Sequence, residues 1–74
     1  MQEEHFELRT EYIDLLQLLK ATGNAATGGE AKQAVEEGLV TVNGEPEDRK
    51  RRKLRAGDVV ELAGQIRITL HAAV

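Results

Sequence analysis

The spacing of the apolar residues along this chain changes at Gly38. Before that glycine, apolar residues recur every three to four positions, as on one face of a helix, and after it they alternate with polar residues, as in a half-buried strand. This change predicts two helices and then three strands, over residues 11–21, 28–37, 39–43, 58–63 and 65–70. The expected fold class is α+β, with two packed helices against a small, mostly antiparallel sheet.

Capping residues indicate where each helix is expected to begin. Thr10 precedes the first helix, whose first turn would then carry Glu11 and Asp14 at the positive end of the helix dipole. The segment 27–30, with the sequence TGGE, has the pattern of a capping box and is expected to start the second helix.

The first nine residues are expected to form an N-terminal segment of their own. Residues 5–9 alternate between polar and apolar side chains, which favours a short strand at the edge of the sheet. A chain of 74 residues has room for one domain, which we place at residues 10–74. The two aromatic residues, Phe6 and Tyr12, occupy positions where a core of this size would use them.

Six of the ten basic residues fall within the seven positions 49–55, which we call the basic run. The chain as a whole is acidic, with a formal net charge of −3, so its positive charge is concentrated in one place. Such a patch creates a local field that attracts phosphate. Four of the six residues are arginines, whose forked guanidinium groups match phosphate oxygens, and Leu54 can anchor the run to the core. A nucleic acid is therefore the leading candidate partner.

Other uses of these residues are less favoured. The basic run could be a solvated loop that protects a sheet edge from pairing with another chain. The segment 23–28 begins like a phosphate loop, but Gly29 and Glu30 replace the lysine and hydroxyl residue which that motif requires. The chain has no Ser and no Cys, so few of the usual side-chain nucleophiles are present and an enzyme is not expected. His5 and His71 are far apart in sequence, so a metal site is not expected. No bound cofactor is expected either.

Three segments of the chain together resemble a known RNA-binding domain. They are 27–32 (TGGEAK), 38–44 (GLVTVNG) and, after the basic run, 56–60 (AGDVV). The domain was first recognised in ribosomal small-subunit protein four and also occurs in tyrosyl-tRNA synthetases and pseudouridine synthases. The resemblance covers about residues 10–70, and it is greatest to the small stand-alone bacterial members of the family, the YbcJ-like proteins.

The resemblance implies the element order β-α-α-β-β-β with an αL motif, in which the second helix and the strand–loop after it grip structured RNA. The predicted site consists of positions that match basic residues of the family, of Arg52 and Arg55 from the same cluster, and of Lys20 as a weaker candidate. Its residues are Lys32, Arg49, Lys50, Arg51, Arg52, Lys53, Arg55 and Lys20. Gly28, Glu36 and Glu37 stand where many members carry basic residues, so most of the binding is expected from the basic run.

We therefore expect a monomeric, cytoplasmic, bacterial protein that is not an enzyme and binds structured RNA, such as ribosomal or transfer RNA, through phosphate and 2′-hydroxyl contacts. No apolar run approaches the length of a membrane span, and the acidic N-terminus is unlike a signal peptide. Two alternatives remain open. One is a DNA-binding helix pair with residues 45–57 as a basic wing. The other is an adaptor whose patch docks an acidic partner, such as a ribosomal or RNA-processing protein.

Overall fold

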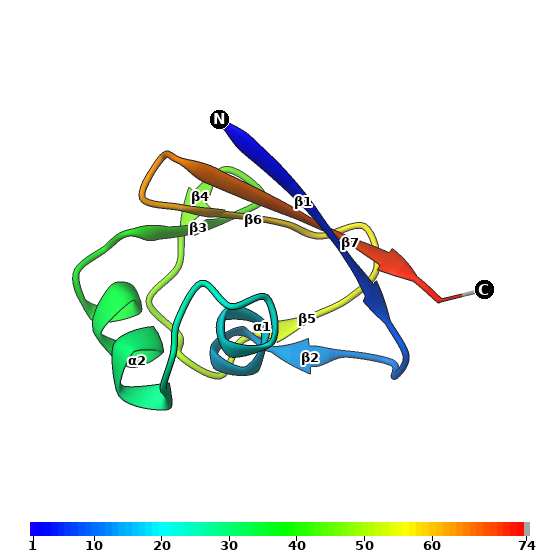
Figure 1. Cartoon of the computed structure of the whole chain (residues 1–74), viewed down its shortest axis with the longest axis horizontal. Helices are drawn as coiled ribbons and strands as arrows, with labels where there is room; N and C mark the ends of the chain where they lie inside the picture. The colour runs from blue at the N-terminus through cyan, green and yellow to red at the C-terminus, as the bar shows by residue number, and fades with distance from the viewer. Residues whose placement is uncertain (74) are drawn as a thin grey trace.

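The computed structural model describes residues 1–73. Its elements are, in chain order, β1 (Gln2–Leu8), β2 (Ile13–Asp14), α1 (Leu15–Ala21), α2 (Gly28–Glu36), β3 (Val40–Val42), β4 (Glu45–Pro46), β5 (Lys53–Leu54), β6 (Val59–Leu62) and β7 (Ile66–Ala72). Five strands form a sheet in the order β1-β7-β6-β3-β4, and β2 pairs with β5 in a separate two-stranded ribbon. Figure 1 shows α1 and α2 together below the larger sheet, with the ribbon beside α1. The predicted α+β architecture is confirmed.

Helix α1 is shorter than the predicted helix 11–21, because it begins only at Leu15. Its N-cap is Asp14, whose carboxylate accepts a hydrogen bond from the backbone N–H of Gln17 at 2.8 Å. Asp14 therefore lies at the cap and not inside the first turn, and Glu11 lies outside the helix altogether. The negative charge still stands next to the positive end of the helix, as the dipole favours.

The prediction that Thr10 caps the first helix is wrong. Its hydroxyl donates instead to the carbonyl oxygen of Tyr12 at 2.8 Å. Residues 13–14 are extended because they pair antiparallel with residues 53–54 in the ribbon. A partner about forty positions away thus keeps residues 13–14 out of the helix, and the local signal for the start of α1 is Asp14 itself, a preferred N-cap residue that the prediction placed inside the first turn.

Helix α2 agrees with the predicted helix 28–37 to within one residue. Thr27 is its N-cap and accepts a hydrogen bond from the backbone N–H of Glu30 at 3.2 Å. The Glu30 carboxylate reaches back to the backbone N–H of Ala26 at 3.1 Å, one residue before the cap. The predicted capping box is confirmed, with its return hydrogen bond shifted by one position.

The three strands predicted after Gly38 appear as β3, β6 and β7, within two residues of the expected bounds. β3 and β4 form a hairpin closed by Asn43 and Gly44, whose φ angles of 53° and 85° suit a two-residue turn of the primed type. Pro46 lies in β4 at the edge of the sheet, where its missing N–H removes no ladder hydrogen bond.

Strand β1 lies at the edge of the larger sheet and runs from Gln2 to Leu8, so it begins three residues before the expected strand 5–9 and ends one residue before its end. It pairs in parallel with β7, so that Gln2 stands opposite Ile66 and Leu8 opposite Ala72. The pairing also brings together two histidines that are far apart in the sequence. His5 Nδ1 and His71 Nε2 lie 2.8 Å apart, and the two rings stack with their centroids at 5.0 Å.

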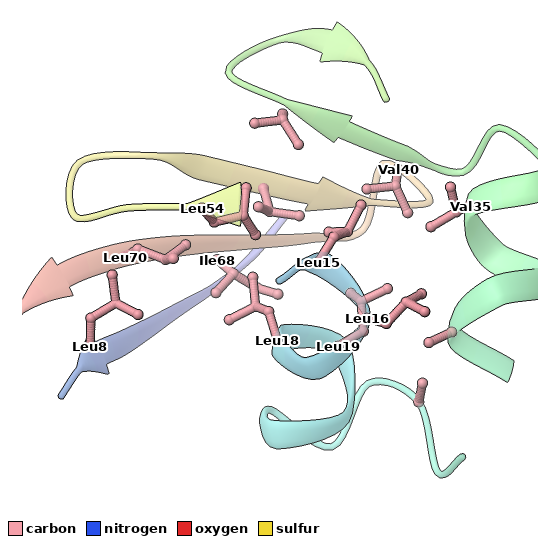
Figure 2. Packing of buried hydrophobic residues seen from close by; sticks show 14 residues of the cluster. Leu8, Leu15, Leu16, Leu18, Leu19, Val35, Val40, Leu54, Ile68 and Leu70 are labelled. Carbon is pink, nitrogen blue, oxygen red and sulfur yellow. The ribbon is translucent and has the colours of Figure 1, made fainter. Parts of the chain in front are cut away.

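The hydrophobic core lies between the helices and the larger sheet (Figure 2). Leu18 of α1 lies next to Ile68 of β7, Leu8 of β1 lies next to Leu70, and Leu54 is fully buried in the same cluster. Leu54 therefore anchors the basic run to the core, as predicted. Phe6 packs against this cluster, whereas Tyr12 is 42% exposed, so its predicted core position is wrong. Within residues 1–73, no helix has both the length and the apolar character that crossing a membrane requires.

Candidate nucleic-acid interface

The basic run is tied to the rest of the fold through its backbone. Residues 49–52 form a turn in which the Arg52 N–H donates to the carbonyl oxygen of Arg49 at 3.3 Å. The Arg52 carbonyl oxygen then accepts a hydrogen bond of 3.0 Å from the backbone N–H of Leu15, the first residue of α1. The chain continues directly into β5, which pairs with β2. The run therefore leaves the core at a fixed place and is not a free loop.

A buried carboxylate, that of Glu47, lies beneath the start of the run. Glu47 is only 5% exposed, and it is the one buried charged residue among those the structure describes. Arg49 donates to it from its backbone N–H at 2.9 Å, from Nε at 3.0 Å and from Nη2 at 3.3 Å. Arg52 donates from Nη1 at 2.6 Å. One carboxylate thus fixes two arginines of the predicted site.

These hydrogen bonds favour the charged form of the carboxylate. Those from Arg49, assisted by the one from Arg52, lower the pKa of Glu47 from 4.5 to about 2, although burial opposes the change. The carboxylate in turn raises the pKa of Arg49. Each guanidinium has five N–H donors and uses only some of them on Glu47, so both keep donors for a ligand. The Arg49 side chain is 68% exposed.

Two other basic side chains of the run form exposed ion pairs. Lys50 Nζ lies 2.8 Å from a carboxylate oxygen of Glu36, at the end of α2, and Arg55 Nη1 lies 3.3 Å from one of Glu11. The hydrogen bond from Lys50 lowers the pKa of Glu36, and the charge of Lys32 one helical turn away adds to this effect. Glu36 therefore lies among basic side chains and is not an isolated negative charge on α2.

Arg51 and Lys53 differ from the other members of the run. Within residues 1–73, neither forms an ion pair with a carboxylate. Lys53 Nζ instead lies 4.8 Å from the centroid of the Tyr12 ring. Because no carboxylate has to be displaced from them, these two side chains are the most available to an incoming phosphate.

Five of the eight predicted residues line one open hollow on the surface: Arg49, Arg51, Arg52, Lys53 and Arg55. Lys50 lies outside this lining and pairs with Glu36 of α2, and Lys32 is close enough to Glu36 for its charge to lower the pKa of that carboxyl. Lys20 is in the last turn of α1, and no hydrogen bond or ion pair between it and the basic run occurs in the part of the chain that the structure describes. We call the five-residue lining the basic hollow.

Sequence reasoning missed two residues of this surface, Glu47 and Tyr12. Nothing local distinguishes Glu47 from its exposed neighbour Asp48, because burial is decided by the tertiary fold. Tyr12 was assigned to a helix face, whereas it precedes β2 and lies beside Lys53 and Arg55. Across residues 1–73, no three side chains of His, Asp or Glu come together in a way that could hold a metal ion.

Comparison with known proteins gives matches over most of the chain. The S4 domain family matches residues 6–69. The "Probable ribosome maturation protein RlbA" of Bacillus subtilis is 49% identical over 55 residues, which is 74% of this chain and 78% of that protein. YbcJ of Escherichia coli is 45% identical over 53 residues, which is 72% of this chain and 76% of that protein.

The fold is also similar to a solved structure. The solution structure of YbcJ from Escherichia coli, described as revealing an αL motif involved in RNA-binding, matches with a TM-score of 0.66 at 39% identity. The match covers 88% of this chain and 85% of that chain. The family match over residues 6–69 therefore includes both helices, the strands β2 to β6 and the segment that carries the basic hollow.

Proposed function

We propose that this chain, which belongs to the S4 domain family, binds structured RNA through the basic hollow. The observation that carries the proposal is the convergence of five basic side chains on one hollow beside an αL fold. Arginine forks and a lysine ammonium there can bind neighbouring phosphates of an RNA backbone. Lys32 and Lys50 extend the same positive surface along α2.

Glu47 has a positioning role in this proposal. Its carboxylate holds Arg49 and Arg52 in defined orientations before RNA arrives, so less side-chain entropy is lost on binding. It also reduces the local positive charge, which suits a protein that must choose a particular RNA and not coat any polyanion. Recognition then depends on the spacing of phosphates and on 2′-hydroxyl groups, which distinguish A-form RNA from DNA.

Within this proposal, we favour ribosomal RNA as the ligand class, because a relative that is 49% identical is named a ribosome maturation protein. Transfer RNA is the second candidate. The role is binding in the cytoplasm without catalysis, and a single chain supplies the whole surface. We leave Lys20 outside the surface, since α1 carries it at the end of the helix away from Leu15.

The test removes the two basic residues that have no carboxylate partner. We expect the variant Arg51→Gln/Lys53→Gln to lose at least about tenfold in affinity for an A-form RNA hairpin, because it loses two phosphate contacts. Its thermal unfolding should change little, since both side chains are exposed. Affinity is measured by fluorescence anisotropy, and a DNA duplex of equal length is titrated in parallel.

A matched pair of single variants controls for net charge. Lys53→Gln and Lys20→Gln each remove one exposed lysine, and only the first lines the hollow. We expect Lys53→Gln alone to weaken RNA binding. If both single variants lost RNA affinity equally, Lys20 would belong to the binding surface. If the double variant Arg51→Gln/Lys53→Gln bound RNA as tightly as the wild type, the basic hollow would be refuted as the site. Tighter binding to DNA than to RNA, or capture of an acidic protein that survives nuclease treatment, would favour one of the two alternatives.

A further inference from the structure

Tyr12 is an exposed aromatic side chain at the border of the basic hollow. It is the only tyrosine of the chain, which also has no tryptophan, and it is one of three large hydrophobic residues that the structure leaves exposed, with Met1 and Leu39. The other aromatic residue, Phe6, packs against the core. The fold therefore places its exposed tyrosine ring beside the basic hollow.

The β2–β5 ribbon determines where this ring lies. Ile13 pairs with Leu54 and Asp14 with Lys53, so the same register continued by one residue places Tyr12 opposite Arg55. Side chains alternate between the faces of a ribbon, and Leu54 is buried, so Tyr12 shares the outer face with Lys53 and Arg55. The distances agree: Lys53 Nζ is 4.8 Å and Arg55 Cζ 5.9 Å from the ring centroid.

A purely structural role accounts for little of this arrangement. A cation near an aromatic ring at an exposed site contributes only about 0.5–1 kcal/mol. The two cations concerned also line the basic hollow, so a phosphate bound to either one would lie next to the ring. Proteins that recognise unpaired nucleotides combine these two components, namely basic groups for the backbone and an aromatic face for the base.

We infer that Tyr12 stacks on an unpaired base of the RNA whose backbone occupies the basic hollow. The ligand class then becomes more specific: a structured RNA with an unpaired nucleotide, such as a bulge or a loop, next to the stem that the hollow binds. Lys53 and Arg55 position the tyrosine ring and also contact the phosphate beside the unpaired nucleotide. This inference rests on the proposed function. It adds a contact with a base to a surface that otherwise recognises only the backbone and the shape of the RNA.

The experiment compares two RNA duplexes that differ by one nucleotide. One is fully paired, and the other carries a single bulged 2-aminopurine, a fluorescent base whose emission falls when it stacks. The variants are Tyr12→Leu, which keeps apolar bulk without a π face, and Tyr12→Phe, which keeps the ring. Leu39→Ala is the matched control, because Leu39 is 40% exposed, close to the 42% of Tyr12, and does not line the hollow.

We expect Tyr12→Leu to weaken binding of the bulged duplex about tenfold, as loss of one base–aromatic stack predicts, and to leave the paired duplex within about twofold. Tyr12→Phe and Leu39→Ala should bind both duplexes like the wild type. The 2-aminopurine emission should fall on binding to the wild type and to Tyr12→Phe, and should stay high with Tyr12→Leu at saturating protein.

The outcomes distinguish this inference from the proposed function on which it rests. If the wild-type protein binds neither duplex, the proposed function fails. If it binds both duplexes and Tyr12→Leu weakens them equally, or weakens neither, then RNA binding stands and the stacking role of Tyr12 is overturned. Thermal unfolding of each variant shows whether a loss of affinity reflects a loss of folded protein. If Tyr12→Leu does not fold, the comparison of Tyr12→Phe with the wild type still tests whether the aromatic ring is sufficient for stacking.

Discussion

At the scale of a single residue, Glu47 connects the stability of the fold with the proposed RNA binding. A buried carboxylate is costly unless it is paired and hydrogen-bonded, and Glu47 receives four hydrogen bonds from Arg49 and Arg52. The same hydrogen bonds orient the two guanidinium groups at the basic hollow. Removing the carboxylate should therefore affect both folding and RNA binding, by different routes.

Stability should depend on pH through Glu47. The pKa of this carboxyl is lowered from 4.5 to about 2 on folding, so the unfolded chain binds the proton more readily than the folded one. The stabilisation is therefore fully present above about pH 4.5 and is lost as the pH falls toward about 2. Its size is at most ~3 kcal/mol, and less in practice because water screens the exposed Arg49.

Urea unfolding of the wild type and of Glu47→Gln, measured from pH 7 down to pH 2.5, tests this dependence. We expect the wild type to be the more stable at pH 7 and the difference in free energy of unfolding to shrink steadily below about pH 4.5. Comparing the two proteins removes the contribution of the other carboxylates. A difference that does not change with pH would contradict the assigned ion pairs.

At the scale of elements, the sequence predicted what local signals determine. Helix α2 has its cap within its own sequence at Thr27, so it was predicted to within one residue, whereas β4, which follows the turn at Asn43 and Gly44, was not among the predicted strands. The start of α1 was missed because β5, far along the chain, holds residues 13–14 in an extended conformation. Tyr12 was predicted to lie in the core for the same reason, and its position beside Lys53 and Arg55 was missed.

The cap of α1 gives a prediction at this scale. Asp14→Ala should destabilise the protein by about 1 kcal/mol, because the backbone N–H of Gln17 loses its acceptor. Asp14→Asn should retain most of the stability, since an asparagine side chain caps about as well as aspartate. The midpoint of chemical denaturation measures both. Equal destabilisation by the two substitutions would show that the charge of Asp14, and not its capping oxygen, is what matters.

For the whole molecule, the basic hollow contains five of the eight residues predicted for the site, because the five lie within seven consecutive positions of the sequence. What the sequence could not show is how the charges are paired. Arg49, Arg52, Lys50 and Arg55 all contact carboxylates, and these come from three different parts of the chain. The free positive charge is therefore smaller than the count of basic residues, and it is centred on Arg51 and Lys53.

Salt dependence tests this distribution of charge. If the five residues of the basic hollow each neutralise one phosphate, the logarithm of affinity should fall with the logarithm of salt concentration at a slope of roughly −3.5 to −4.5. Arg51→Gln should flatten the slope by about one unit. Lys50→Gln should flatten it less, because Lys50 lies outside the hollow and is paired with Glu36. If the two substitutions flattened the slope equally, this would contradict the placement of Arg51 in the basic hollow and of Lys50 outside it.

The parallel pairing of β1 with β7 has a consequence for how the protein folds. Gln2 pairs with Ile66, so the first strand of the sheet must wait until nearly the whole chain is available. Both helices, the β2–β5 ribbon and the strands up to β6 lie between these two partners, and their contacts close smaller loops. Loop-closure entropy therefore favours their earlier assembly. The helices, the β2–β5 ribbon and the hairpin strands can therefore assemble first, and the parallel pairing of β1 with β7 completes the fold.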